Sequence, residues 1–150
     1  MRPLLAVLPL LLLSACSSFR PEAENIRPVP AERLLAYQEA LPDGGRLVVN
    51  RDMGLIGGGC YVALEVDRQL AARIAMAEVV SFEVPAGTRV LGLKIDPLDD
   101  TLCGMGRLNK ELAVQVTPGS TQYFHVVSES KHGFDLRTDN NPPLAGNDRI

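Results

Sequence analysis

Short runs in which apolar and polar residues alternate fill about 90 residues of the chain after Asp43-Gly44-Gly45. Alternate side chains of an extended strand point to opposite faces, so such runs are typical of strands with one buried face. The predicted inward-facing sets are Val62, Leu64 and Val66; Val80, Phe82 and Val84; Leu91, Leu93 and Ile95; Leu112, Val114 and Val116; Phe124 and Val126; and Phe134 and Leu136.

Turn residues separate these runs at Asp67 to Gln69, at Pro85 to Gly87 and at Pro118 to Ser120. An α/β fold would need helices of about ten or more residues between its strands. We therefore expect a mainly β chain with one domain over 44–137, an antiparallel β-sandwich of seven or eight short strands.

The N-terminus has a different character. Arg2 precedes an apolar run from Pro3 to Leu13, which is shorter than the roughly 20 residues that a membrane-spanning helix needs but suits a signal peptide. The sequence Leu13-Ser14-Ala15-Cys16 resembles a bacterial lipobox, in which the signal peptide is cut before the cysteine and the cysteine is lipidated. We expect residues 1–15 to be removed and membrane lipid to be bound through acylated Cys16.

The residue after the cysteine bears on the membrane involved. Similarity to Gram-negative lipoproteins implies that Ser17, in place of an aspartate, directs the protein to the outer membrane with its body in the periplasm. The alternative is an ordinary secretory signal followed by a chance cysteine.

The regions flanking the sandwich are less apolar. Residues 16–43 are predicted to contain a flexible tether over Ser17 to Val29 and one short helix over Pro30 to Leu41, in which Leu34, Tyr37 and Leu41 follow helical spacing. An irregular lead-in is the alternative to that helix. We expect the tail over 138–150, which is poor in apolar residues, to be disordered.

Charge and cysteine content narrow the function classes. Without residues 1–15, the chain has 14 basic and 18 acidic residues, a net charge of −4, and no basic stripe, which makes nucleic-acid binding improbable. Cys60 and Cys103 remain as an even pair in an oxidising compartment and are expected to form a disulfide. Two buried thiols are the alternative.

The glycine-rich stretch before Cys60 is the most unusual local sequence. Gly57, Gly58 and Gly59 do not lead into a helix with Lys and Ser or Thr, as a phosphate-binding loop would. The main interpretation is a turn or bulge between strands. The alternative is an exposed binding loop for a partner or glycan, with Arg51 and Asp52 as its polar rim or as a surface ion pair.

No catalytic residues and no cofactor are predicted. His125 and His132 have no acidic or cysteine partner at the spacing of a zinc site, and Asp96, Asp99 and Asp100 lack the pattern of a calcium loop. We therefore expect no metal site.

Several segments resemble a family of small bacterial outer-membrane lipoproteins. They are Arg33-Leu34-Leu35-Ala36-Tyr37-Gln38, Arg51-Asp52 leading to Gly57-Gly58-Gly59-Cys60, Val66-Asp67 followed by Ala71-Ala72-Arg73, and Glu78 ahead of Val84-Pro85-Ala86-Gly87. More distantly, the strand followed by Pro-x-Gly is similar to PEGA and carboxypeptidase-regulatory sandwiches, an immunoglobulin-like arrangement. Two cysteines cannot supply the thiolates of an iron–sulfur cluster.

These observations favour a lipid-anchored, non-enzymatic interaction or structural module of the cell envelope with an envelope protein as partner. A glycan-binding module, with peptidoglycan as the ligand, is the second hypothesis. An enzyme is the third.

Overall fold

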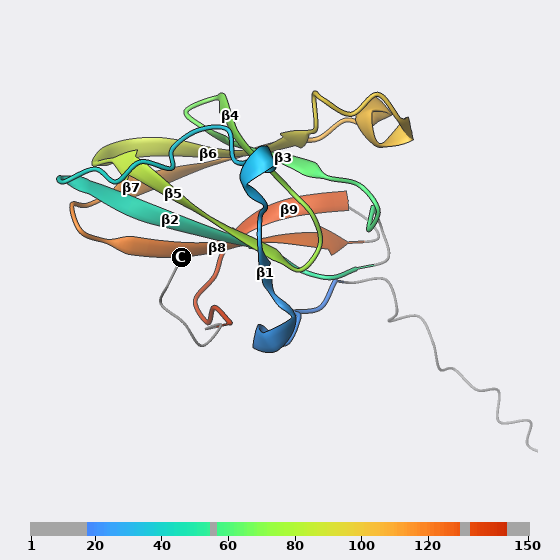
Figure 1. Ribbon diagram of the computed structural model, residues 1–150, viewed down its shortest axis with the longest axis horizontal. Coiled ribbons are helices and arrows are strands. Elements are labelled where there is room, and N and C mark those ends of the chain that lie inside the picture. The colour runs from blue at the N-terminus through green and yellow to red at the C-terminus, as the bar shows by residue number, and fades with distance from the viewer. Residues whose placement is uncertain (1–17, 55–56, 130–132, 144–150) are drawn as a thin grey trace, which may run out of the picture.

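The computed structural model describes residues 18–54, 57–129 and 133–143. Its two sheets are stacked face to face (Figure 1). The strands, in chain order, are β1 (Arg27–Pro28), β2 (Gly44–Arg51), β3 (Val62–Val66), β4 (Gln69–Ile74), β5 (Glu78–Pro85), β6 (Gly87–Ile95), β7 (Asn109–Val116), β8 (Thr121–Glu129) and β9 (Gly133–Thr138). The predicted mainly β sandwich is confirmed.

The five-stranded sheet has the order β1-β5-β2-β8-β9, and the four-stranded sheet has the order β4-β3-β6-β7. Strand β2 is antiparallel to β5 but parallel to β8, and β1 is parallel to β5. The five-stranded sheet is therefore mixed, which corrects the expectation of purely antiparallel sheets. A parallel pair is possible because β2 and β8 are not joined by a hairpin, since β3 to β7 lie between them in the chain.

The core lies between the two sheets. Its fully buried side chains include the predicted inward sets of β3 and β5, together with Leu91 and Leu93 of β6. Burying one such aliphatic or aromatic side chain contributes roughly 1.5–3 kcal/mol, so these alternating sets stabilise the pairing of the sheets.

The predicted helix over 30–41 is wrong. In the described part of the chain, helical backbone is confined to three 3₁₀ turns, η1 (Ala23–Asn25), η2 (Ala31–Arg33) and η3 (Leu102–Met105). After η2 the chain is not helical, because Leu34 is extended and forms a bridge with Ala72, and Tyr37 has the positive φ of 61° of left-handed backbone. Pairing with the edge of β4 takes the place of local helical hydrogen bonds.

The two ends of the sandwich can be told apart by their connections. At one end, here called the turn end, lie the short connections 67–68, 86 and 117–120. At the other, here called the N-terminal end, lie the longer connections 52–61 and 96–108, the turn 75–77 and the start of the described chain at Ser18.

Candidate functional site

The described chain begins with a segment that is fastened to the sheet. The Ser18 amide donates to the Ser128 carbonyl at 2.9 Å, and the Ser18 hydroxyl accepts from the Ser128 amide at 3.0 Å. Phe19 forms an antiparallel bridge with Met53, with hydrogen bonds of 2.8 and 2.9 Å. Residues 18 and 19, which were expected to belong to a flexible tether, are thus paired with the chain at the ends of β8 and β2.

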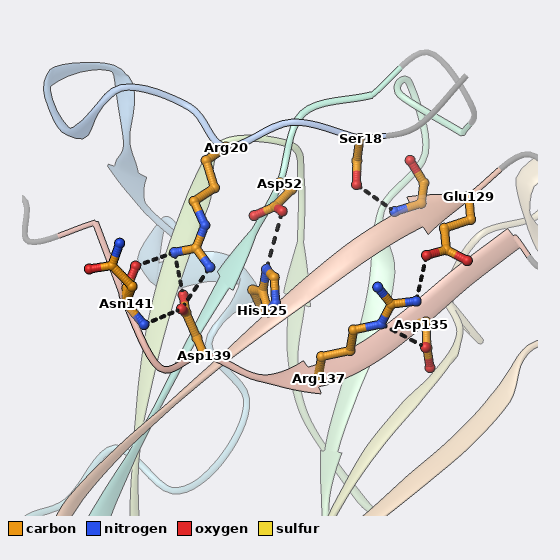
Figure 2. Close-up of polar contacts among 10 residues, drawn as sticks. Ser18, Arg20, Asp52, His125, Glu129, Asp135, Arg137, Asp139 and Asn141 are labelled. Carbon is orange, nitrogen blue, oxygen red and sulfur yellow. Dashed lines mark hydrogen bonds and ion pairs between the residues drawn. The ribbon is translucent and has the colours of Figure 1, made fainter. Parts of the chain in front are cut away.

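Arg20 continues this attachment through a charged contact. Its guanidinium donates to both carboxylate oxygens of Asp139, at 2.7 and 2.8 Å, and also to the Asn141 carbonyl (Figure 2). The Asp139 side chain has no exposed surface. Residues 139 and 141 were expected to be disordered, so the pair orders both flanks of the domain, while residues 144–150 lie outside the described chain.

The ionisation of Asp139 reflects this contact. Burial alone would raise the pKa of the carboxyl group, but hydrogen bonds from Arg20 and from the Asn141 amide hold it below its ordinary value. In turn, the hydrogen bond to Asp139 raises the pKa of Arg20. The carboxylate is therefore the stable form in the folded protein at neutral pH.

Asp52 and His125 form a second polar contact on the same outer face of the five-stranded sheet. Asp52 Oδ2 lies 3.2 Å from Nδ1 of His125, and both side chains are mostly buried (Figure 2). The sequence interpretation placed His125 opposite Phe124 and Val126, and the structure agrees. A carboxylate beside an imidazole can orient a base. The contact lay beyond sequence reasoning because 73 residues separate the two groups.

Arg51 points in the other direction, which is the normal consequence of preceding Asp52 by one position in extended chain. Only 1% of Arg51 is exposed. Its guanidinium donates to the carbonyls of Cys60, Ile74 and Gly57 at 2.6 to 2.9 Å. It also lies 5.0 Å from the centre of the Phe134 ring. Burial lowers the pKa of Arg51 to about 10.

The predicted ion pair or shared polar rim of Arg51 and Asp52 is wrong, because the two side chains occupy opposite faces of the sheet. The glycine loop behaves as a packed turn. Gly57 has a φ of +65°, and a Cβ there would lie 2.5 Å from the Phe134 ring. A Cβ at Gly58 would lie 3.0 Å from Met76, whereas Gly59 faces open space. Arg51 and these contacts fix the loop that leads to Cys60.

Cys60 and Cys103 are joined by the predicted disulfide, with their Cα atoms 5.6 Å apart. The bond connects the glycine loop to the segment 96–108, here called the η3 loop, which projects from the N-terminal end in Figure 1. Three apolar side chains of this loop are strongly exposed: Leu98 (59%), Leu102 (84%) and Met105 (77%). Sequence reasoning identified the disulfide but missed this apolar exposure.

The acidic residues of the η3 loop have structural partners. Asp96 forms an ion pair of 2.7 Å with Arg73, and Asp99 accepts hydrogen bonds from the Thr101 amide and hydroxyl. The hydrogen bonds from the Thr101 hydroxyl and amide lower the pKa of Asp99. Within the described ranges, no three His, Cys, Asp or Glu residues are arranged to hold a metal ion.

An arginine–tyrosine stack adjoins the disulfide. Arg33 and Arg73 lie 4.5 and 5.1 Å from the centre of the Tyr61 ring. Arg33 also donates to both carboxylate oxygens of Glu78, at 2.6 and 2.7 Å. The stack thus joins η2, β4 and the start of β5 at the N-terminal end. Sequence reasoning missed it because its members are far apart in the chain.

A shallow groove of about 870 Å³ crosses the outer face of the four-stranded sheet beneath the η3 loop. Its apolar lining comes from Ile95, Pro97 and Leu108, and its charged lining comes from Glu65, Arg68, Lys94, Arg107 and Glu111. Hydrogen bonds from Arg68 and Lys94 lower the pKa of Glu111. A surface with apolar and oppositely charged groups side by side is suited to a polypeptide segment.

Searches for relatives give no match to any family model, curated protein or solved structure. The predicted lipobox, Leu13-Ser14-Ala15-Cys16, lies outside the described residues. Among the residues that are described, no helix has the length and apolar character needed to cross a membrane.

Proposed function

We propose that this protein is a lipid-anchored module of the bacterial outer membrane, held at the periplasmic face by acylated Cys16, and that its sandwich binds an envelope protein without catalysing a reaction. The lipobox-like sequence supports the anchor. The disulfide between Cys60 and Cys103 supports an oxidising compartment, since such bonds persist outside the cytosol.

The groove beneath the η3 loop is the observation that carries the binding role. It is open and bordered by a loop that the disulfide holds in place. Side chains of both charge signs lie beside apolar ones there, so an extended polypeptide could satisfy all three kinds of group at once.

The partners of the buried and half-buried acidic groups support a role other than catalysis. Asp139, Glu78 and Asp96 each form an ion pair with an arginine from a distant segment, and Asp52 lies beside His125 outside the groove. These contacts join parts of the fold and do not surround one cavity.

The glycan hypothesis requires an aromatic ring on which a sugar can stack. The exposed aromatic side chains of the described chain are Phe19 and Tyr61. Two guanidinium groups already lie within about 5 Å of the Tyr61 ring, and Phe19 lies on the N-terminal segment outside the groove. We therefore favour a protein partner and keep the glycan as an outcome of the test.

The anchor is tested by radiolabelled palmitate in cells that produce the full chain. We expect label on the wild-type protein, none on Cys16→Ala, and loss of that variant from the outer-membrane fraction. An unlabelled wild-type protein, or a variant that fractionates identically, would contradict the anchor.

The groove is tested by a photo-crosslinking amino acid placed at Arg107 in living cells. The matched control is Gln115, an exposed residue of β7 outside the groove. We expect a protein adduct of constant mass from position 107, none from position 115, and its loss when Lys94→Glu is added. Equal labelling at both positions would contradict a protein site, and co-sedimentation with purified sacculi would favour the glycan.

A further inference from the structure

We infer that the N-terminal end of the sandwich rests directly on the lipid bilayer, with Phe19 and the η3 loop residues Leu102 and Met105 inserted into its interfacial layer. This inference rests on the proposed anchor at Cys16. It adds a second contact with lipid, made by the folded domain itself.

The first observation is how little chain separates the anchor from the fold. Ser18 is fixed to Ser128 through two hydrogen bonds, Phe19 is bridged to Met53, and Arg20 is held by Asp139. Ser17 alone lies between Cys16 and Ser18. An extended chain spans at most about 3.6 Å per residue, so the Cα atoms of residues 16 and 18 are within about 7 Å of each other.

A connection this short sets the position of the domain. Acyl chains on Cys16 would be buried in the bilayer, and the attachment point on the sheet could not move far from the headgroups. The N-terminal end must then be close to the membrane surface, whereas a flexible tether over residues 17–29 would have allowed the domain to stand away from it.

The second observation is the distribution of exposed apolar side chains. Phe19 is 60% exposed, and Leu98, Leu102 and Met105 are among the most exposed apolar residues of the described chain. All four belong to the N-terminal end, where Figure 1 shows both the start of the described chain and the η3 loop. Leu35 and Leu41, which lie elsewhere, are less exposed, at 45% and 40%. Large apolar side chains exposed at one end of a folded domain are typical of a contact surface.

The contacts of Ser18, Phe19 and Arg20 with the five-stranded sheet are here called the clamp. Further contacts join this clamp to the η3 loop. Gly54 lies so close to Ser18 that a Cβ on the glycine would be 3.3 Å from the Ser18 Cβ. Arg51 holds the carbonyls of Gly57 and Cys60, and Cys60 is bonded to Cys103. The apolar tip is therefore held in a fixed relation to the anchor point and can enter the membrane without a loss of loop order.

Lipid suits this tip better than a second protein surface does. The side chains are long and flexible, and each buried methylene group adds to membrane affinity, so an exposed leucine and methionine contribute favourably without a shaped complement.

Tryptophan fluorescence tests the inference directly, because the chain contains no tryptophan. The full lipidated protein is reconstituted into vesicles of phosphatidylethanolamine and phosphatidylglycerol with brominated acyl chains, which quench a tryptophan by contact. The variants are Leu102→Trp, Met105→Trp and, as the matched control at the turn end, Thr117→Trp. Each position is solvent-exposed or projects from a loop, so the fold should tolerate each change.

We expect the first two variants to be quenched several-fold more strongly than the control. Quenching of L102W and M105W no greater than that of T117W would overturn the inference. Blue-shifted emission without quenching would also overturn it and would indicate that a protein surface, another copy of the chain included, covers the loop.

The intact mass of the same preparation separates this inference from the proposed anchor. An acylated protein whose η3 loop is not quenched overturns the membrane contact alone. A protein that lacks the acyl mass overturns the proposed anchor and, with it, this inference.

Discussion

The two ends of the sandwich are held together by different kinds of contact. At the turn end, strands are joined through local backbone geometry: Asp67 and Arg68 have positive φ values of 49° and 64°, as a two-residue hairpin turn with left-handed central residues requires, and Gly119 has a φ of 74°. At the N-terminal end, the fastening groups are distant in sequence. The disulfide spans 43 positions, and the hydrogen bond from the Ser128 amide to the Ser18 hydroxyl spans 110.

This difference shows where the fold depends on long-range contacts. Local turns need few special side chains, and they leave the turn end without an apolar projection comparable to the η3 loop. The N-terminal end contains buried charges, a covalent bond and exposed apolar groups, which together position a loop. Contacts between residues that are distant in sequence are expected at this end if the η3 loop must be held in one position for binding.

Loss of the disulfide should have the largest effect. Replacing Cys60 and Cys103 together by serine removes a bond that closes a long loop, and chain-entropy estimates predict a loss of about 4 kcal/mol in the free energy of unfolding. Urea unfolding of the oxidised wild type and the double variant measures it. The intact mass of the wild type should first be two hydrogens below the mass calculated for its reduced chain. A loss of less than about 1 kcal/mol in the free energy of unfolding of the double variant would show that the bond does not stabilise this end.

Removal of Arg51 should have the next largest effect. In Arg51→Met three carbonyl groups lose their common hydrogen-bond donor, while the cost of burying a cation is removed. We expect the first effect to be larger, with a loss of about 3 kcal/mol in the free energy of unfolding measured in urea. The matched control is Arg89→Gln at the turn end, where the side chains of the Arg89–Asp67 pair are 26% and 34% exposed and the pair contributes less than about 1 kcal/mol. Equal losses in the two variants would remove the distinction between the ends.

The sequence predicted the parts of the fold that local patterning controls. Alternation at Val80, Phe82 and Val84 identified a strand and its buried face, because a pleated strand must present every second side chain to the core. The disulfide followed from an even cysteine count and the inferred compartment. The parallel pairing of β2 with β8 did not follow, because neither strand encodes its neighbour.

The N-terminal end shows why the candidate site was harder to predict. Low apolar content made residues 18–29 look like a tether, but composition does not register an ion pair such as that of Arg20 with Asp139. Leu34 and Tyr37 have helical spacing, yet hydrogen bonding with β4 and a left-handed residue overrode it. Interactions between distant residues decided the structure wherever local preference was weak.

A smaller effect is expected for the clamp that fixes the N-terminal segment. Arg20→Gln leaves the buried carboxylate of Asp139 without its cation, and after allowance for the partial exposure of Arg20 we expect a loss of about 2 kcal/mol. Arg137→Gln is the matched control on the same sheet, since its partners Glu129 and Asp135 are about one-third exposed and the loss should be below about 1 kcal/mol. Similar unfolding free energies for the two variants would argue against the clamp, as would unchanged amide-exchange protection at Ser18 and Phe19 in R20Q.

Acidification should reveal the same clamp as the smallest of these effects. Because the folded pKa of Asp139 is below its unfolded value of about 3.9, its contribution to stability is complete above that pH and is lost as the pH falls through the folded pKa. Other lowered carboxyl groups, such as Asp135, titrate in wild type and R20Q alike, so the difference between the two proteins isolates Asp139. In R20Q the buried carboxyl group of Asp139 lacks its cation, so burial raises its pKa above the ordinary value. The gap between the two unfolding free energies should therefore be constant above that raised pKa and should narrow as the pH falls from it through the lowered pKa of Asp139 in the wild type, where protonation removes the charge that Arg20 binds. Urea titrations from neutral pH into acid measure the gap, and one that stays constant into strong acid would mean that Arg20 stabilises the N-terminal segment by packing and not by its contact with Asp139.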